Sequence, residues 1–219
     1  MIRAVFFDVG ETLVNEDGVW RAWADWYGVP PLTFMGMLGA VIERRQHHLA
    51  VFEAFDPAFA LESAEAARAA AGLSYALSDA DLYDDALPCL RALRSSGYVV
   101  GIAGNQPPSV TETLFASAGV DVVASSAAWG VEKPSPEFFA RCAAAAGVAP
   151  EEVAYVGDRV DNDVVPAKAA GMTAVFLRRG PWGYVHATWP EAAAADLRVE
   201  SLAELPAALA RLAEREAAS

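Results

Sequence analysis

The chain has 219 residues, which is enough for one large domain or for a core domain with a modest insertion. Its formal net charge of -13 argues against DNA or RNA as a partner, because a phosphate backbone binds to a basic face. The two cysteines, Cys89 and Cys142, lack the spacing of a metal site or redox pair, which is typical of a reducing compartment. The sequence shows no secretory signal and no apolar run of about 20 residues, so we expect a cytoplasmic protein without membrane association.

The first element is a short apolar run, residues 4–7, that predicts a buried strand and ends abruptly at Asp8. In an open α/β sheet the carboxyl ends of the strands border the crevice where ligands bind, so Asp8 is a candidate functional residue. An ordinary turn that contains an aspartate fits residues 4–14 almost as well. The rest of the chain has to decide between these two interpretations.

Residues 15–85 have the pattern of a helical block without a strand. The aromatic residues Trp20, Trp23 and Tyr27 recur at the three-and-four spacing of one helical face and are expected to form its core. Gly and Pro residues separate the apolar runs. We expect helices over residues 20–27, 32–51, 57–71 and 78–83.

From Leu87 onward the pattern alternates between helix and strand. Strands are expected at residues 98–103, 120–124, 153–156 and 173–177, and helices at 87–93, 108–118, 135–146, 163–170 and 201–216. This alternation predicts a parallel sheet with helices on both faces. We therefore expect an α/β protein with a Rossmann-like, doubly wound core, residues 1–14 and 86–219, and an inserted all-helical cap domain at 15–85.

Polar groups follow three of the predicted strands. Asp8 follows the first, Gly104 and Asn105 follow the second, and Asp158 follows the fourth, with Asp163 nearby. Because parallel strands end at the same edge of a sheet, these residues are expected to converge. Carboxylates packed together repel one another and raise each other's pKa unless a cation neutralises them. A hard divalent ion with oxygen ligands, Mg²⁺, fits that requirement best.

Lys133 stands in the segment VEKPSP, before a helix that begins with prolines. Taken alone, it reads as an ordinary solvated lysine. Considered with the acids, it is a candidate to neutralise a phosphate group or a carboxylate nucleophile.

The order and spacing of these residues resemble the motifs of the haloacid dehalogenase-like hydrolase superfamily, and the resemblance covers essentially the whole chain. Asp8-Val9-Gly10-Glu11-Thr12 resembles the first motif, DxDxT in the family's phosphatases. The second motif, a Ser or Thr that ends a strand, falls on Gly104, and the third, a Lys before a helix, on Lys133. The fourth is matched by Gly157-Asp158 with Asp163. The helical block resembles the family's inserted cap, which closes over the site and selects the substrate.

This resemblance implies a Mg²⁺-dependent phosphatase whose partner is a small molecule, a phosphate ester or an acyl phosphate. Asp8 would be the nucleophile and form an aspartyl phosphate that water then hydrolyses. Lys133 would offset the charge of the phosphoryl oxygens, and Thr12 with the backbone N–H groups near Gly104 and Asn105 would bind the substrate. The implied ligands of Mg²⁺ are the Asp8 carboxylate, the Gly10 carbonyl, Asp158 and Asp163.

Two positions depart from the family pattern. Gly10 replaces the aspartate that protonates the leaving group, a role worth about 10²–10⁴ in rate. Glu11 is the nearest acid, but neighbouring residues of an extended segment point in opposite directions, so it reads either as a substitute or as a solvated turn residue. Gly104 removes a hydroxyl donor worth about 1–3 kcal/mol, which Asn105 compensates in part. We expect a weakened phosphatase that prefers acyl or aryl phosphates.

Two alternatives remain open. Dehalogenases of the family also lack an acid at position 10, so a metal-independent 2-haloacid dehalogenase is one, although Asp158 and Asp163 keep the metal-type pattern. The other is a phosphate- or partner-binding protein that has lost turnover, motivated by Gly10 and Gly104. The sequence indicates neither the substrate nor an oligomeric state.

Four further residues are weaker candidates. His47 and His48 lie on a predicted helix of the block, where they either contact a substrate anion or belong to a solvated face. Trp129 and Trp182 lie in loops that are candidates to border the site.

Overall fold

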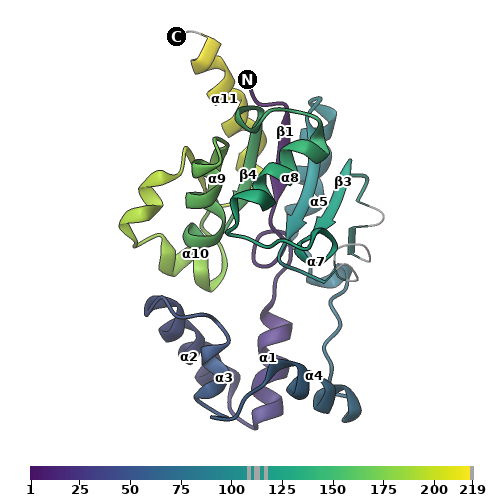
Figure 1. Ribbon diagram of the computed structural model, residues 1–219, viewed down its shortest axis with the longest axis vertical. Coiled ribbons are helices and arrows are strands. Elements are labelled where there is room, and N and C mark those ends of the chain that lie inside the picture. Colours follow the sequence, from purple (N-terminus) through teal and green to yellow (C-terminus); the bar gives the residue numbers. More distant parts are fainter. Residues whose placement is uncertain (108–109, 111–113, 116–117, 218–219) are drawn as a thin grey trace. The chain divides into compact units, whose positions relative to one another are not determined.

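The computed structural model describes residues 1–107, 110, 114–115 and 118–217 (Figure 1). The chain divides into two compact units, which we call the core unit (Met1–Asn15 and Leu82–Ser219) and the helical unit (Glu16–Asp81). None of the helices in the described ranges combines the length and the apolar character needed to cross a membrane.

The core unit is built on six parallel strands in the order β3-β2-β1-β4-β5-β6. β1 lies between β2 and β4, with Phe7 opposite Ile102 on one side and Val156 on the other. The strand order reverses at β1, and such a switch point is where α/β sheets bind ligands. The predicted α/β fold with a doubly wound parallel sheet is confirmed. The strands are β1 (Ala4–Phe7), β2 (Val99–Gly104), β3 (Val122–Ser125), β4 (Val153–Gly157), β5 (Thr173–Leu177) and β6 (Leu197–Val199).

Helices cover both faces of this sheet (Figure 1). On one face α8 (Pro136–Ala146) packs on β1 and β2 beside α9 (Val165–Ala169), and on the other α5 (Ala86–Ser95) packs on β2 and against α11 (Leu205–Ala217). Phe139 of α8 is buried in one core cluster with Phe6 of β1 and Tyr155 of β4. The remaining helical segments are α7 (Ser126–Trp129), η2 (Pro150–Glu152), the π-helix η3 (Val160–Val164), α10 (Gly180–His186), η4 (Pro190–Ala194) and η5 (Leu202–Glu204).

The helical unit is held together by aromatic side chains. Trp20 and Trp23 are buried, as predicted from their spacing, and the Trp23 and Phe52 ring centroids lie 4.6 Å apart. Phe34 stacks on Phe55 at 5.2 Å. Its elements are α1 (Asp17–Tyr27), α2 (Pro31–Glu43), α3 (Ala50–Glu53), α4 (Leu61–Ala70) and the 3₁₀ turn η1 (Asp79–Asp81).

Several element predictions need correction. The helix expected over 32–51 is two helices, because the chain leaves helical geometry after Glu43 and Arg45 adopts a positive φ of 58°. The expected helix at 78–83 is only the turn η1. β6 and α10 were not predicted, since β6 has three residues with an exposed Arg198 and α10 begins with Gly and Pro. The helix expected at 108–118 lies largely outside the described residues.

Candidate active site

The ends of β1 and β4 bring three buried acids together. Asp8 directly follows β1, Asp158 follows β4, and Asp163 lies in η3. Each offers a carboxylate oxygen, and these oxygens lie within 4.8 Å of one another. The convergence expected from the strand ends is therefore present.

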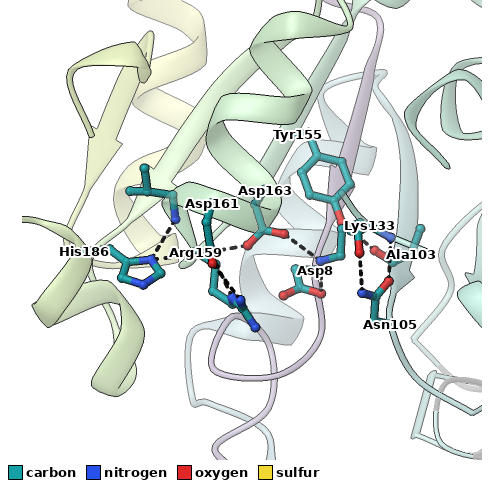
Figure 2. Close-up of polar contacts among 10 residues, drawn as sticks. Asp8, Ala103, Asn105, Lys133, Tyr155, Arg159, Asp161, Asp163 and His186 are labelled. Carbon is teal, nitrogen blue, oxygen red and sulfur yellow. Dashed lines mark hydrogen bonds and ion pairs between the residues drawn. The ribbon is translucent and has the colours of Figure 1, made fainter. Parts of the chain in front are cut away.

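Lys133 lies between two of these acids (Figure 2). Its Nζ is 2.7 Å from Asp8 Oδ1 and 2.6 Å from Asp163 Oδ1, and the residue is only 3% exposed. Burial alone would lower the pKa of this amine, but the charges of Asp163 and Asp8 outweigh that effect and raise its pKa. Lys133 is thus a charged, buried partner of both acids, and not the solvated lysine that its sequence context alone suggests.

The Asn105 side chain forms two hydrogen bonds with the main chain of Lys133. Its Nδ2 donates to the Lys133 carbonyl at 3.0 Å, and its Oδ1 accepts from the Lys133 N–H at 2.9 Å (Figure 2). We expected this amide to compensate for the missing hydroxyl at position 104. In the structure the amide is bound to the main chain of Lys133, so it helps to hold the segment that carries this lysine.

Asp163 is fixed through both oxygens. Oδ1 accepts from Lys133, and Oδ2 accepts from the Arg159 backbone N–H at 3.0 Å. The carboxylate packs so closely on β4 that a Cβ at Gly157 would lie 2.3 Å from Oδ2. Burial raises the pKa of Asp163 to about 6, with Lys133 opposing this rise and Asp8 adding to it. The close packing of the Asp163 carboxylate on β4 therefore requires a glycine at residue 157.

Asp158 is the uncompensated acid of the group. It is 1% exposed, and among the described residues neither of its carboxylate oxygens has a hydrogen-bond partner. Burial, with the charges of Asp163, Asp8 and Glu11, raises its pKa well above the ordinary value. An ionised carboxylate in such a place is costly unless a cation binds it. The oxygen donors and the unpaired Asp158 fit a hard divalent cation such as Mg²⁺.

Gly10 and Thr12 follow Asp8 in the same loop, and Gly104 at the end of β2 lies beside the Asp8 carboxylate. Gly10 pairs with Val14 in an isolated bridge, and Thr12 is fully buried with a hydroxyl that has no partner within the described ranges. A Cβ at Gly104 would lie 2.7 Å from Asp8 Oδ1. The glycine that replaces the family's Ser or Thr therefore lets the Asp8 carboxylate lie against the end of β2.

Glu11 is not the solvated turn residue that one interpretation of the sequence gave. It is 4% exposed, and the Tyr83 hydroxyl donates to its Oε2 at 2.6 Å. Its positive φ of 53° breaks the alternation assumed for an extended segment. Glu11 is therefore a fourth buried acid of the core unit, and its charge contributes to the raised pKa of Asp158.

Sequence reasoning did not identify Tyr83, Arg159 or His186 as residues around the site. Arg159 pairs with Asp161 at 2.9 Å, and the buried His186 accepts from the Val160 N–H through Nδ1 at 3.0 Å (Figure 2). These contacts fix η3, which carries Asp163. The charged residues concentrated between positions 158 and 163 were the available signal for Arg159. No local sequence pattern points to Tyr83 or His186.

The weaker candidates occupy different places. His47 and His48 lie in the segment between α2 and α3 of the helical unit, with ring centroids 4.3 Å apart, and not on the helix we expected. Trp129 packs on Phe138 at 5.3 Å. Trp182 lies in α10, where it is 7% exposed and its ring centroid is 5.7 Å from the Arg159 guanidinium.

Comparison with known proteins identifies the family. The family model for haloacid dehalogenase-like hydrolases matches residues 2–171. The chain is 38% identical over 105 residues to a glyceraldehyde 3-phosphate phosphatase of Methanopyrus kandleri, a match covering 46% of this chain and 45% of the relative. It is 36% identical over 128 residues to a phosphoserine phosphatase of Thermus thermophilus, covering 57% and 49%. The matched segments thus span about half the length of these relatives.

Solved structures agree over nearly the full chain. A HAD phosphatase from Thermococcus onnurineus superposes with a TM-score of 0.59 at 26% identity, covering 95% of this chain and 98% of that one. An L-2-haloacid dehalogenase from Xanthobacter autotrophicus shares the fold, with a TM-score of 0.64, 23% identity and coverage of 94% and 97%. The chain therefore belongs to the haloacid dehalogenase-like hydrolases.

Proposed function

We propose that this hydrolase is a Mg²⁺-dependent phosphatase that acts on a small phosphate ester or acyl phosphate, with the helical unit as its cap. The strongest support is that two features occur together at the sheet switch point. One is the buried Asp8–Lys133 ion pair, and the other is the Asp158 carboxylate, which has no hydrogen-bond partner among the described residues. The names of the phosphatase relatives support the substrate class. We also propose a reducing, cytoplasmic environment, in line with Cys89 and Cys142, which are free thiols.

In this proposal Asp8 supplies the nucleophile. A carboxylate oxygen of Asp8 forms a bond to phosphorus, and the bond from phosphorus to the leaving-group oxygen breaks. Water then attacks the same phosphorus, the bond from phosphorus to Asp8 breaks, and inorganic phosphate leaves with the carboxylate restored. Lys133 forms an ion pair with Asp8 before the reaction and neutralises phosphoryl oxygens during it.

Mg²⁺ would be held by the carboxylates of Asp8, Asp158 and Asp163 and by the Gly10 carbonyl. When bound, it neutralises the charge that builds up on the transferring phosphoryl group. Asp158 has two oxygens free for such an ion, whereas Asp163 is already shared with Lys133 and the Arg159 N–H. Asp158 is therefore the ligand on which cation affinity depends most.

Gly10 and Gly104 make this a weakened phosphatase. Gly10 has no side chain to protonate a leaving alkoxide, which removes a contribution of about 10²–10⁴ in rate. Aryl and acyl phosphates have leaving groups that depart without a proton, so they are the preferred substrates. Breakdown of the phosphoenzyme also lacks a base at position 10, so the intermediate accumulates.

The experiment measures hydrolysis of p-nitrophenyl phosphate and acetyl phosphate with and without Mg²⁺. We expect Mg²⁺-dependent turnover with a burst of one product per enzyme, and its loss in Asp8→Asn. Gly10→Asp should raise turnover of alkyl phosphates, and Gly10→Ala, which adds a Cβ without an acid, should not. A linear time course with fast turnover would contradict the weakened mechanism, and activity retained in Asp8→Asn would contradict the nucleophile.

Two other functions follow if no phosphate ester reacts. The glycine at position 10 also fits a metal-independent 2-haloacid dehalogenase, which would release chloride from a 2-chloroacid without Mg²⁺. It fits a protein without turnover as well, which would bind Mg²⁺ and a phosphate mimic and hydrolyse nothing. Asp158 offers two carboxylate oxygens to a cation, which favours a metal-dependent reaction over the first of these.

A further inference from the structure

Two side chains outside the four family motifs, Tyr83 and Arg179, contact the loop after β1, residues 8–14. The Tyr83 hydroxyl donates to Glu11 Oε2 at 2.6 Å, and Arg179 Nη1 donates to the Thr12 carbonyl at 3.0 Å. The Arg179 guanidinium also lies 4.1 Å from the centroid of the Tyr83 ring. These two contacts thus hold two neighbouring residues of the loop, Glu11 and Thr12.

The conformation of Glu11 shows why such contacts are needed. Its φ of 53° lies in the left-handed region, which costs a residue with a Cβ about 1 kcal/mol or more. Its N–H donates to the Val14 carbonyl at 2.7 Å and closes a tight turn. A Cβ at Gly180 would lie 2.4 Å from Glu11 Oε2, so the chain leaves space for this carboxylate. The turn therefore depends on a buried glutamate and on its donor.

Gly10, immediately before this turn, increases the need for support. A glycine has more conformational freedom than any other residue, and here it replaces the aspartate of the family motif. The segment that carries Asp8 and the Gly10 carbonyl is therefore more flexible by itself than in a chain with an aspartate at that position. Contacts to residues 11 and 12 are well placed to restrict it.

Arg179 and Tyr83 are themselves immobilised. Arg179 forms an ion pair with Asp85, whose Oδ2 also accepts from Ser201 Oγ at 2.6 Å and from the Leu202 N–H at 2.9 Å. The Tyr83 N–H donates to the Leu13 carbonyl at 3.0 Å. Burial, followed by the charge of Glu11, raises the pKa of Tyr83, so its hydroxyl stays protonated as a donor. Both side chains that contact the loop are therefore held in place by further contacts.

We propose that Tyr83 and Arg179 are positioning residues of this hydrolase, which act through Glu11 and Thr12 to hold the loop that carries Asp8 and the Gly10 carbonyl. The catalytic part of this statement rests on the proposed function, and the structural part does not. Tyr83 lies where the chain returns from the helical unit, directly after the bridge between Val14 and Leu82. The segments that leave and re-enter the core unit are thereby joined to the nucleophile loop.

The chain contains a matched control pair. Arg178 and Tyr184 form a similar cation–π contact at 4.9 Å, but Tyr184 is 60% exposed. The test compares Tyr83→Phe with Tyr184→Phe and Arg179→Lys with Arg178→Lys. Amide hydrogen exchange of Glu11 and Val14, with β4 amides as the reference for global unfolding, is the readout that needs no activity.

We expect Tyr83→Phe to accelerate exchange of the loop amides by about tenfold, as loss of a hydrogen bond to a charged group predicts, with the β4 amides unchanged. On aryl phosphate, kcat should fall by about tenfold with KM unchanged, because the loss affects the transition state. In a Glu11→Ala background, Tyr83→Phe should change kcat less than about twofold, because the residue it acts through is gone.

Unchanged loop exchange in Tyr83→Phe, or equal effects in Tyr184→Phe, would overturn the proposal. So would a Tyr83→Phe effect on kcat that is as large in the Glu11→Ala background as in the wild type. If the wild type shows no turnover at all, the proposed function fails, and the exchange measurement still decides whether Tyr83 holds the loop.

Discussion

The two sides of the acid cluster differ in how their charges are compensated. On one side, Lys133 is within 2.7 Å of Asp8 and 2.6 Å of Asp163, and Asn105 holds the lysine in place. On the other side, Asp158 is just as buried, yet no donor among the described residues reaches it. The first side is compensated within the protein, whereas on the second a proton or a cation from outside has to neutralise Asp158.

This difference predicts which substitutions lower stability and which remove cation binding. The Lys133 side brings three charges out of water, and their mutual attraction offsets the desolvation only while all three are present. At Asp158 the charge of Arg159 opposes the rise only in part, and burial first, then the neighbouring negative charges, keep its pKa raised. We therefore expect substitutions on the Lys133 side to lower stability, and substitutions at Asp158 to remove cation binding.

The largest effect is expected for Lys133→Met. It leaves Asp8 and Asp163 buried without their cation, which typically costs about 3–5 kcal/mol in the free energy of unfolding. Urea denaturation at neutral pH measures this loss. Lys168→Met is the control, because it removes a lysine from a more exposed ion pair, with Asp196, and should cost much less. Equal losses for the two variants would show that the buried pair has no special weight.

A smaller loss of stability is expected when a glycine that packs against Asp163 or Asp8 is replaced by alanine. Gly157→Ala places a Cβ 2.4 Å from Asp163 Cγ, and this carboxylate cannot move because both its oxygens are bound, so we expect a loss of about 1–3 kcal/mol. Gly104→Ala places a Cβ 2.7 Å from Asp8 Oδ1 and 3.1 Å from Val9 Cγ2, and Asp8 is bound to Lys133 through that one oxygen, so a small shift of the side chain relieves the contact at lower cost. Thermal unfolding that shows the reverse order would contradict the difference in mobility.

The smallest effect, of opposite sign, is expected for Asp158→Asn without metal. The folded-state pKa of Asp158 is raised, so the folded protein holds a proton that the unfolded chain releases, and wild-type stability falls as the pH rises through that window. The neutral variant avoids this loss and should be more stable than the wild type at about pH 8, with no gain at about pH 4. Asp161→Asn removes a carboxylate whose pKa is lowered by Arg159 and should destabilise instead. A destabilised Asp158→Asn at the higher pH would contradict the unpaired state of this acid.

The sequence was sufficient for the parallel sheet and for the gathering of Asp8, Asp158 and Asp163, because strand ends in a parallel sheet converge whatever the loops do. It was insufficient where a side chain reaches across the fold. Asn105 turned out to hold Lys133, 28 residues away, and Glu11 is buried because its φ is positive, which alternation in an extended segment does not anticipate. Tyr83 carries no local pattern, and only its contact with Glu11, 72 residues away, reveals its role.

The central claim is that Asp158 is the uncompensated acid that a divalent cation neutralises. Calorimetric titration of the metal-free protein with Mg²⁺, beside Asp158→Asn, tests it most directly. We predict one bound Mg²⁺ per chain in the wild type, with release of protons near neutral pH, and no measurable binding in the variant. Equal affinity in both proteins would contradict the account.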